Sequence, residues 1–194
     1  MNLEFKNMKK ICIAVLFFSA SLSLFGHMVM KLSDLHTMAQ NSDCVIHGRV
    51  GDQRVEIGKF GRLVTLTEVE IIDPLRSDKK AGGIFTIYQV GGELFDGKNR
   101  IVMPIVGGQR YNPGQEIMFF GLKLEKNFVS FGMGQGKFDI FRDEKEETII
   151  EDLGDIEVMG LKNQIKGKNP LSYSDLELFK MEIRLMLENK RKDG

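Results

Sequence analysis

Short segments of apolar or alternating apolar and polar residues recur along the chain between turn signals, and this pattern predicts short β-strands. In residues 63–72, apolar side chains alternate with threonine and glutamate, and Asp73-Pro74 is expected to end that strand. Further strands are predicted at 44–50, 84–90, 116–122, 128–131 and 137–141, and a short run at 101–103 is expected to be an edge or an exit because Pro104 follows it. Residues 116–122 are too apolar to have a solvated face and therefore predict a central strand. Five or six short strands with turns at regular spacing predict a mainly β fold, either a sandwich or a barrel.

Two segments have the period of amphipathic helices instead. Ser33-Asp34 precedes a short apolar pattern and predicts a capped N-terminal helix that ends at 41–43. A C-terminal amphipathic helix is predicted at about 174–190, with capping-box spacing at 174–177. Its apolar stripe consists of Leu176, Phe179, Ile183 and Met186 or Leu187.

The N-terminal residues have a third pattern, which is that of a secretory signal peptide. Lys9 and Lys10 precede the apolar run 11–25, and the small residues Ser21 and Ser23 suit cleavage. We therefore expect 1–26 to be removed on export to the periplasm or the medium. A retained membrane anchor is the alternative, but the run ends before the roughly 20 apolar residues that a spanning helix needs.

The remaining residues, 27–194, are expected to form a single β-barrel domain with its core at about 44–141 and the C-terminal helix attached. The full chain has 27 basic and 27 acidic residues, and without 1–26 it has 24 and 26. This slightly acidic balance argues against nucleic acid as a partner, because a phosphate backbone requires a basic surface. Cys44 is the one cysteine in 27–194, so no internal disulfide is possible there.

Several short motifs follow one another in a definite order along these predicted elements. They are Asn41-Ser42-Asp43, Val45 to Val50, Thr65 with Thr67, Gly91-Gly92, Tyr111 to Glu116 before Phe119-Phe120, and Gly134 to Phe138. This order resembles a recurrent type of exported bacterial domain of unknown function. Over about 33–141 it is also similar, more loosely, to the OB-fold inhibitory domain of the tissue inhibitors of metalloproteinases and to netrin modules.

The resemblance implies a five- to six-stranded, OB-like Greek-key barrel with a short N-terminal helix and a C-terminal helix. The inhibitor family addresses a catalytic metal through an N-terminal Cys-x-Cys, which is absent from this sequence. The resemblance therefore implies a fold, and it does not imply inhibition of metalloproteases.

The glycine-rich segment 132–138 invites comparison with a phosphate-binding loop. Phe131 stands where that motif requires glycine, and Phe138 stands where it requires serine or threonine. A strand rather than a helix is predicted to follow. We interpret the glycines as a hairpin with a close backbone approach.

No catalytic residue, cofactor or metal site is predicted. His27, His36 and His47 lack the spacing of zinc ligands. Cys44 and His47 are three residues apart on one predicted strand, which places their side chains on opposite faces and makes a nucleophile–base pair unfavourable.

We therefore expect an exported, non-enzymatic binding or accessory module of the cell envelope, with a protein or glycan as partner. Membrane contact is expected only if the signal segment is retained. By analogy with OB folds, the contact region is predicted to be the face of the second and third strands together with the adjoining loop 91–96. Its residues are Thr65, Thr67, Tyr88, Gln89, Gly91, Gly92 and Glu93. The alternatives are a hydrolase with an unrecognised site and a membrane-anchored structural protein. An exposed apolar patch or an unpaired edge strand would favour the binding module.

Overall fold

The computed structural model describes residues 29–30, 33–105, 107, 109–142, 147–152, 157–158 and 172–192. Within these residues the protein is mainly β, with one large sheet and two α-helices. The predicted signal peptide, 1–26, lies outside the described residues.

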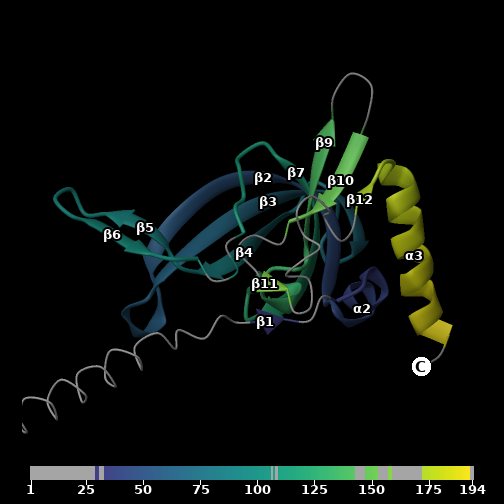
Figure 1. Ribbon diagram of the computed structural model, residues 1–194, viewed down its shortest axis with the longest axis horizontal. Helices are drawn as coiled ribbons and strands as arrows, with labels where there is room; N and C mark the ends of the chain where they lie inside the picture. Colours follow the sequence, from purple (N-terminus) through teal and green to yellow (C-terminus); the bar gives the residue numbers. More distant parts are fainter. Residues whose placement is uncertain are drawn as a thin grey trace, which may run out of the picture.

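Five strands of the large sheet form a partly closed ring (Figure 1). They are β2 (Cys44–Ile57), β3 (Leu63–Arg76), β4 (Ile84–Val90), β7 (Glu116–Leu124) and β8 (Asn127–Ser130). Antiparallel pairing joins β7 to β2, β2 to β3, and β3 to β4. The ring closes through β8, which pairs antiparallel with β7 and meets β4 in parallel at one position, Ile87 with Phe128.

The edge of β7 that faces away from β2 is shared between two partners. Its second half pairs with β8, and its first half pairs with β9 (Lys137–Arg142). The sheet continues from β9 through β10 (Glu147–Glu151) to β12 (Ser172–Tyr173). Before β9 the chain passes so close to β7 that a Cβ atom on Gly136 would collide with the Phe120 carbonyl oxygen. This close approach explains the glycine at 136.

Two short sheets lie apart from the large one. β1 (Val29–Met30) pairs in parallel with β11 (Glu157–Val158), and β5 (Gly92–Phe95) pairs antiparallel with β6 (Arg100–Met103). We call the β5–β6 hairpin the arm, because it extends away from the ring beyond the other strands (Figure 1). Single 3-10 turns, η1 (Lys59–Gly61) and η2 (Phe131–Met133), occur at the β2–β3 hairpin tip and after β8.

Alternate residues of β7 face two different hydrophobic clusters. Ile117 and Phe119 point into the ring, where they pack with apolar side chains of β2, β3, β4 and β8. Met118 and Phe120 point to the opposite side and pack against β9, β10 and the helices. The absence of a polar face on the predicted strand 116–122 is thus explained, because β7 is buried on both sides.

Both predicted helices are present. In α2 (Leu35–Asn41), the Asp34 carboxylate accepts a hydrogen bond of 2.7 Å from the Thr37 N–H. α3 (Leu176–Lys192) is capped by Asp175, whose Oδ1 accepts from two backbone N–H groups at 2.9 and 3.0 Å. The apolar stripe predicted for α3 is buried against the sheet. No helix among the described residues combines the length and apolar character needed to cross a membrane.

The strands differ from the sequence prediction in several places. β2 continues past its predicted end at 50 to Ile57, and β1, β11 and β12 have no predicted counterpart. β3 does not end at Asp73-Pro74 but continues to Arg76, and Pro74 pairs with Ile46 beside a register shift. A proline donates no hydrogen bond to the ladder, and a bulge tolerates it for that reason. The predicted contact loop that begins at Gly91 includes a strand, β5, because it pairs with β6 to make the arm.

Helix α3 is expected to depend on one aromatic side chain. Phe179 is buried, and its ring centroid lies 5.4 Å from that of Phe138 and 4.2 Å from that of Tyr173. Phe179→Ala should lower the free energy of unfolding by about 3–5 kcal/mol, measured by urea denaturation. The control is Leu178→Ala, since Leu178 is 58% exposed on the same helix. Similar losses for the two variants would contradict this packing.

Candidate functional site

The predicted contact residues do not form one surface. Thr65, Thr67 and Gly91 are buried, Tyr88, Gln89 and Gly92 are half-buried, and Glu93 is exposed. They separate into three environments, which are the interior of the ring, a cleft beside β4 and the base of the arm.

The two threonines face the interior of the ring. Thr65 Oγ1 donates a hydrogen bond of 2.8 Å to the Gly91 carbonyl oxygen, and Thr67 is completely buried. A partner could not reach either side chain without opening the ring. Because both side chains lie on the inner face of β3, they are buried and cannot belong to a contact surface.

Residues 109–111, which precede β7, lie against the interior of the ring. Tyr111 packs into the interior cluster, and Gln109 is buried beside it. Gln89 Nε2 donates a hydrogen bond of 3.1 Å to the Gln109 carbonyl oxygen, and Gln53 donates to the Tyr111 carbonyl oxygen. We call residues 109–111 the plug.

A buried lysine holds the plug in place. Lys137 is only 1% exposed, and its Nζ lies 2.5 Å from the Arg110 carbonyl oxygen. It also lies 2.7 Å from a carboxylate oxygen of Asp139 and 2.7 Å from one of Asp152. The ammonium group stands 5.1 Å from the centre of the Tyr111 ring. The ammonium group is thus held by two hydrogen bonds and a further ion pair, which suits a structural clamp better than a nucleophile.

Glu151, at the end of β10, is a further buried acid. Neither carboxyl oxygen has a hydrogen-bond partner among the described residues. Burial raises the pKa of Glu151 to about 8, so the group is largely protonated at neutral pH. A buried acid of this kind can serve in catalysis, but neither it nor the lysine clamp lines the cleft beside β4.

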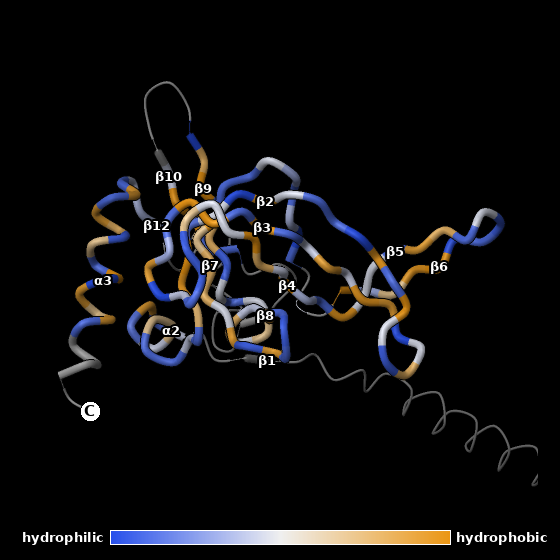
Figure 2. Tube along the Cα trace, turned by 180° about the vertical axis from the view of Figure 1, so that it is seen from behind, coloured by the Kyte–Doolittle hydropathy of each residue, from blue (hydrophilic) through white to orange (hydrophobic). Residues whose placement is uncertain are grey.

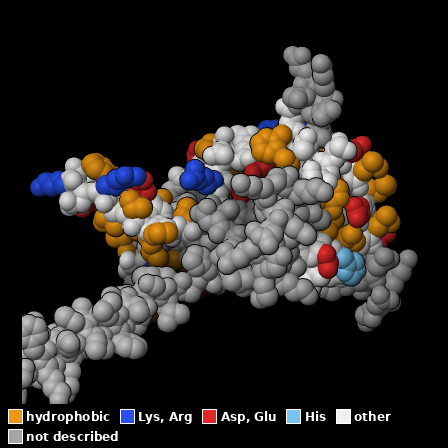
Figure 3. Space-filling model, in the orientation of Figure 1, with side chains coloured by type: hydrophobic (Ala, Val, Ile, Leu, Met, Phe, Trp, Pro, Cys, Tyr) orange, Lys and Arg blue, Asp and Glu red, His pale blue; other side chains and the backbone are white. Residues whose placement is uncertain are grey.

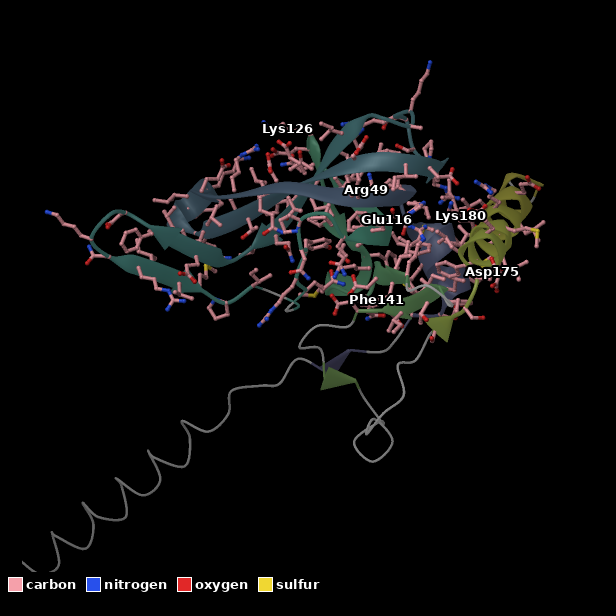
Figure 4. The ribbon with its side chains drawn as sticks, turned by 90° about the horizontal axis from the view of Figure 1, so that it is seen from above. Arg49, Glu116, Lys126, Phe141, Asp175 and Lys180 are labelled. Atoms are coloured by element: carbon pink, nitrogen blue, oxygen red, sulfur yellow. The ribbon has the colours of Figure 1, made fainter. Side chains whose placement is uncertain are left out.

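A second polar cluster lies outside the ring, where it meets α3. His47 Nε2 lies 3.0 Å from Glu116 Oε2, and Arg49 and Arg142 donate to the same carboxylate at 3.0 and 2.6 Å. Figure 4 shows Arg49 and Glu116 together, with Lys180 of α3 close by. This cluster joins β2, β7 and β9 at the point where the sheet branches.

His47 is not placed to act as a catalytic base. It is buried, and burial outweighs its hydrogen bond to Glu116 and lowers the pKa of the imidazole. Cys44 points to the opposite face of β2, into the ring, as the spacing predicted. Burial raises the pKa of the Cys44 thiol to about 12, which keeps it unreactive. Across the described residues, no group of three or more His, Cys, Asp or Glu side chains is arranged to hold a metal ion.

The most accessible apolar groups lie at the end of the molecule that carries the arm. Phe60, at the tip of the β2–β3 hairpin, is 96% exposed, and Ile57 beside it is 63% exposed. On the arm, Phe95 is 66% and Val102 58% exposed. Figure 2 shows the hydrophobic stretches of β5 and β6 on either side of a polar turn, and Figure 3 shows hydrophobic side chains gathered along the arm.

The pairing of the arm determines which side chains share a face. Glu93 lies opposite Val102, and Phe95 lies opposite Arg100. Glu93 accepts hydrogen bonds of 2.5 and 2.8 Å from the Arg100 guanidinium across this face. The face therefore combines two exposed apolar side chains with an internally neutralised ion pair. Of this face, only Glu93 is predicted from the sequence, because residues 91–96 are expected there to form a loop.

Comparison with known proteins adds no identification. No protein-family model matches the chain, and no curated protein matches its sequence significantly.

The Glu116 cluster predicts how stability depends on pH. Burial alone would raise the pKa of Glu116, but hydrogen bonds from Arg49, His47 and Arg142 outweigh it and lower the pKa from 4.5 to about 2. The carboxylate therefore stabilises the fold above about pH 4.5, and this contribution is lost as the pH falls toward 2. Glu116→Gln should cost about 2–3 kcal/mol at pH 7 and much less at pH 2.

The measurement is urea denaturation of both proteins across this pH range. Glu188→Gln serves as the control, because Glu188 is exposed on α3. An equal loss at pH 7 and pH 2 in Glu116→Gln would show that the charge of Glu116 is not the stabilising factor.

Proposed function

We propose that the chain is an exported, non-enzymatic binding module built on an OB-like barrel, and that its arm binds a partner protein of the cell envelope. The arm is the observation that carries this proposal. It is a two-stranded sheet with exposed apolar side chains, and its strands pair only with each other among the described residues.

The pairing order of the ring supports an OB-like barrel. The five ring strands can be numbered one to five in chain order, as β2, β3, β4, β7 and β8. Neighbouring strands then follow the order 1-2-3-5-4, and strand four also pairs with strand one. In this order strands four and five are exchanged relative to the chain, and the contact between strands three and five is the single parallel one. Both features suit a partly open Greek-key barrel of five strands. Strands β9, β10 and β12 are additions to that plan.

An isolated two-stranded hairpin is only marginally stable in water. The arm meets the ring at its base, where a Cβ on Gly92 would contact Val55 and Thr65, and then continues away from it. The outer edges of β5 and β6 have no strand partner among the described residues. A partner strand that joins either edge would satisfy its backbone groups and cover apolar side chains such as Phe95 and Val102.

The proposal of a non-enzymatic role is supported by the surroundings of the titratable groups. Lys137 and His47 are buried, and their polar contacts serve the plug and the branch of the sheet. Exposed apolar surface and unpaired strand edges are features of a binding module. Among the described residues, no titratable group lies in the cleft beside β4 in an arrangement that would favour a hydrolase instead.

Binding through the arm is tested with Phe95→Ser/Val102→Ser. Each wild-type residue is more than half exposed, so the double variant should fold normally. Its matched control is Leu178→Ser/Leu185→Ser, which removes apolar side chains of similar exposure from the outer face of α3. The immobilised proteins are incubated with envelope extract, and the retained proteins are quantified by mass spectrometry.

We expect one partner to be retained by the wild type and the control and lost by the arm variant. With that partner purified, the arm variant should raise the dissociation constant at least about tenfold. Equal retention by all three proteins would refute a role for the arm. A wild type that is dimeric in light scattering, with a monomeric arm variant, would show that the arm binds a second copy rather than a partner. Turnover of a peptide or glycan panel would support the hydrolase instead.

Export is a separate part of the proposal and is tested on the protein recovered from cells. Its mass should correspond to a chain that lacks 1–26, because Lys9, Lys10 and the apolar run 11–25 have the pattern of a cleaved signal peptide. Reversal of both lysine charges, Lys9→Glu/Lys10→Glu, should leave the protein unprocessed. A mass that includes 11–25 would support the retained anchor.

A further inference from the structure

The ring has a cleft where its closure is incomplete. β4 and β8 are bridged only between Ile87 and Phe128. Beyond that point Tyr88 to Val90 form one wall of the cleft, and the ends of β7 and β8 with the following turn form the other. The cleft has a volume of about 510 Å³, which falls within the roughly 300–1,000 Å³ of typical small-molecule sites.

The walls of this cleft are mainly apolar. Its aliphatic lining consists of Val90, Leu122, Leu124, Val129 and Met133. These side chains come from β4, from the end of β7, from β8 and from η2. They create a surface suited to a hydrocarbon chain, whose transfer from water is favourable in proportion to the area buried.

The amide side chains in the cleft are already engaged with the protein. Gln89 Nε2 donates to the Gln109 carbonyl oxygen at 3.1 Å. Gln109 Nε2 donates to the Asp152 carbonyl oxygen at 2.8 Å and to that of Gly134, and its Oε1 accepts from the Tyr111 hydroxyl at 3.2 Å. A ligand that used these amide N–H groups would have to break these bonds, whereas an apolar chain would leave them intact.

One charged side chain, Arg62, is among the described residues that line the cleft. Its guanidinium has no hydrogen bond or ion pair to another described residue. Lys59 at the same hairpin tip differs in this respect, because its charge is paired with Glu125 at a distance of 2.8 Å between Nζ and Oε1. An exposed, uncompensated guanidinium beside an apolar cleft matches a ligand that carries an anion at one end.

From this combination we infer that the cleft binds a single-chain amphiphile whose hydrocarbon lies between β4 and β8 and whose anionic head group pairs with Arg62. A carboxylate and a phosphate head group share the required chemistry. The site is distinct from the arm and does not depend on the binding of a protein partner there.

The inference is tested by displacement of N-phenyl-1-naphthylamine, a neutral fluorescent probe of apolar sites, from the purified protein. The competitors are dodecanoate, dodecyl phosphate and dodecanol, which share one chain length and differ in the head group. All are used below their micellar concentrations. Dodecanoate, dodecyl phosphate or both should displace the probe at about tenfold lower concentration than dodecanol, since a charge-assisted hydrogen bond adds to the same chain contacts.

Two variants, each with a matched control, locate the two parts of the ligand. Arg62→Gln should abolish the preference for the anions and leave dodecanol unchanged. Arg110→Gln removes an equal charge from a neighbouring cavity and should retain the preference. Leu124→Glu should weaken all competitors and the probe, and Leu185→Glu, at a similarly exposed leucine of α3, should not. Thermal unfolding verifies that each variant is folded.

The inference would be overturned by equal displacement with dodecanol and both anions, or by an anion preference that persists in Arg62→Gln. Unchanged probe binding in Leu124→Glu would place the apolar site elsewhere and also overturn it. Displacement by an apolar peptide but by none of the amphiphiles would show that the cleft accepts a peptide strand on β4. The relative potency of dodecanoate and dodecyl phosphate identifies the preferred head group.

Discussion

Burial of β7 on both faces is the constraint around which the rest of the protein is arranged. Its inner residues complete the interior of the ring, and its outer residues hold the layer that contains α2 and α3. One edge of β7 is occupied by β2, and the other is divided between β8 and β9. The division is possible because Gly136 allows the chain to pass against the Phe120 carbonyl oxygen. A side chain there would separate β9 from β7 and so weaken the attachment of α3.

The same division explains why the ring is incomplete. β8 is short and pairs with the second half of β7, so it meets β4 at a single position. The cleft with Arg62 begins where that pairing stops. The arm arises from the connection between β4 and β7, which also supplies the plug that Lys137 holds in place. Both accessible surfaces are therefore consequences of how the ring closes, while Lys137, His47 and Glu116 make their polar contacts within the protein.

Much of the fold could be predicted because its signals are local. Alternation identified the strands, and Asp34 and the apolar stripe of α3 identified the helices. The prediction that Cys44 and His47 face opposite sides of one strand is confirmed for the same reason. It was wrong to end β3 at Pro74, because tolerance of that proline depends on a bulge that β2 provides. The contact region was predicted as one face, but Thr65 and Thr67 lie inside the ring.

The sequence by itself determined the class of the protein, the positions of its main strands and helices, and the absence of an internal disulfide from 27–194. The strands and helices follow from the period of apolar residues, which is a property of a few neighbouring positions. The absence of a disulfide follows from the count of cysteines. Only the tertiary structure decided which polar side chains were buried, that β5 and β6 form an arm, and that Arg62 stands beside an apolar cleft. Those features depend on contacts between strands far apart in the chain, and residues such as Arg62 and Val129 carry no local signal of their proximity.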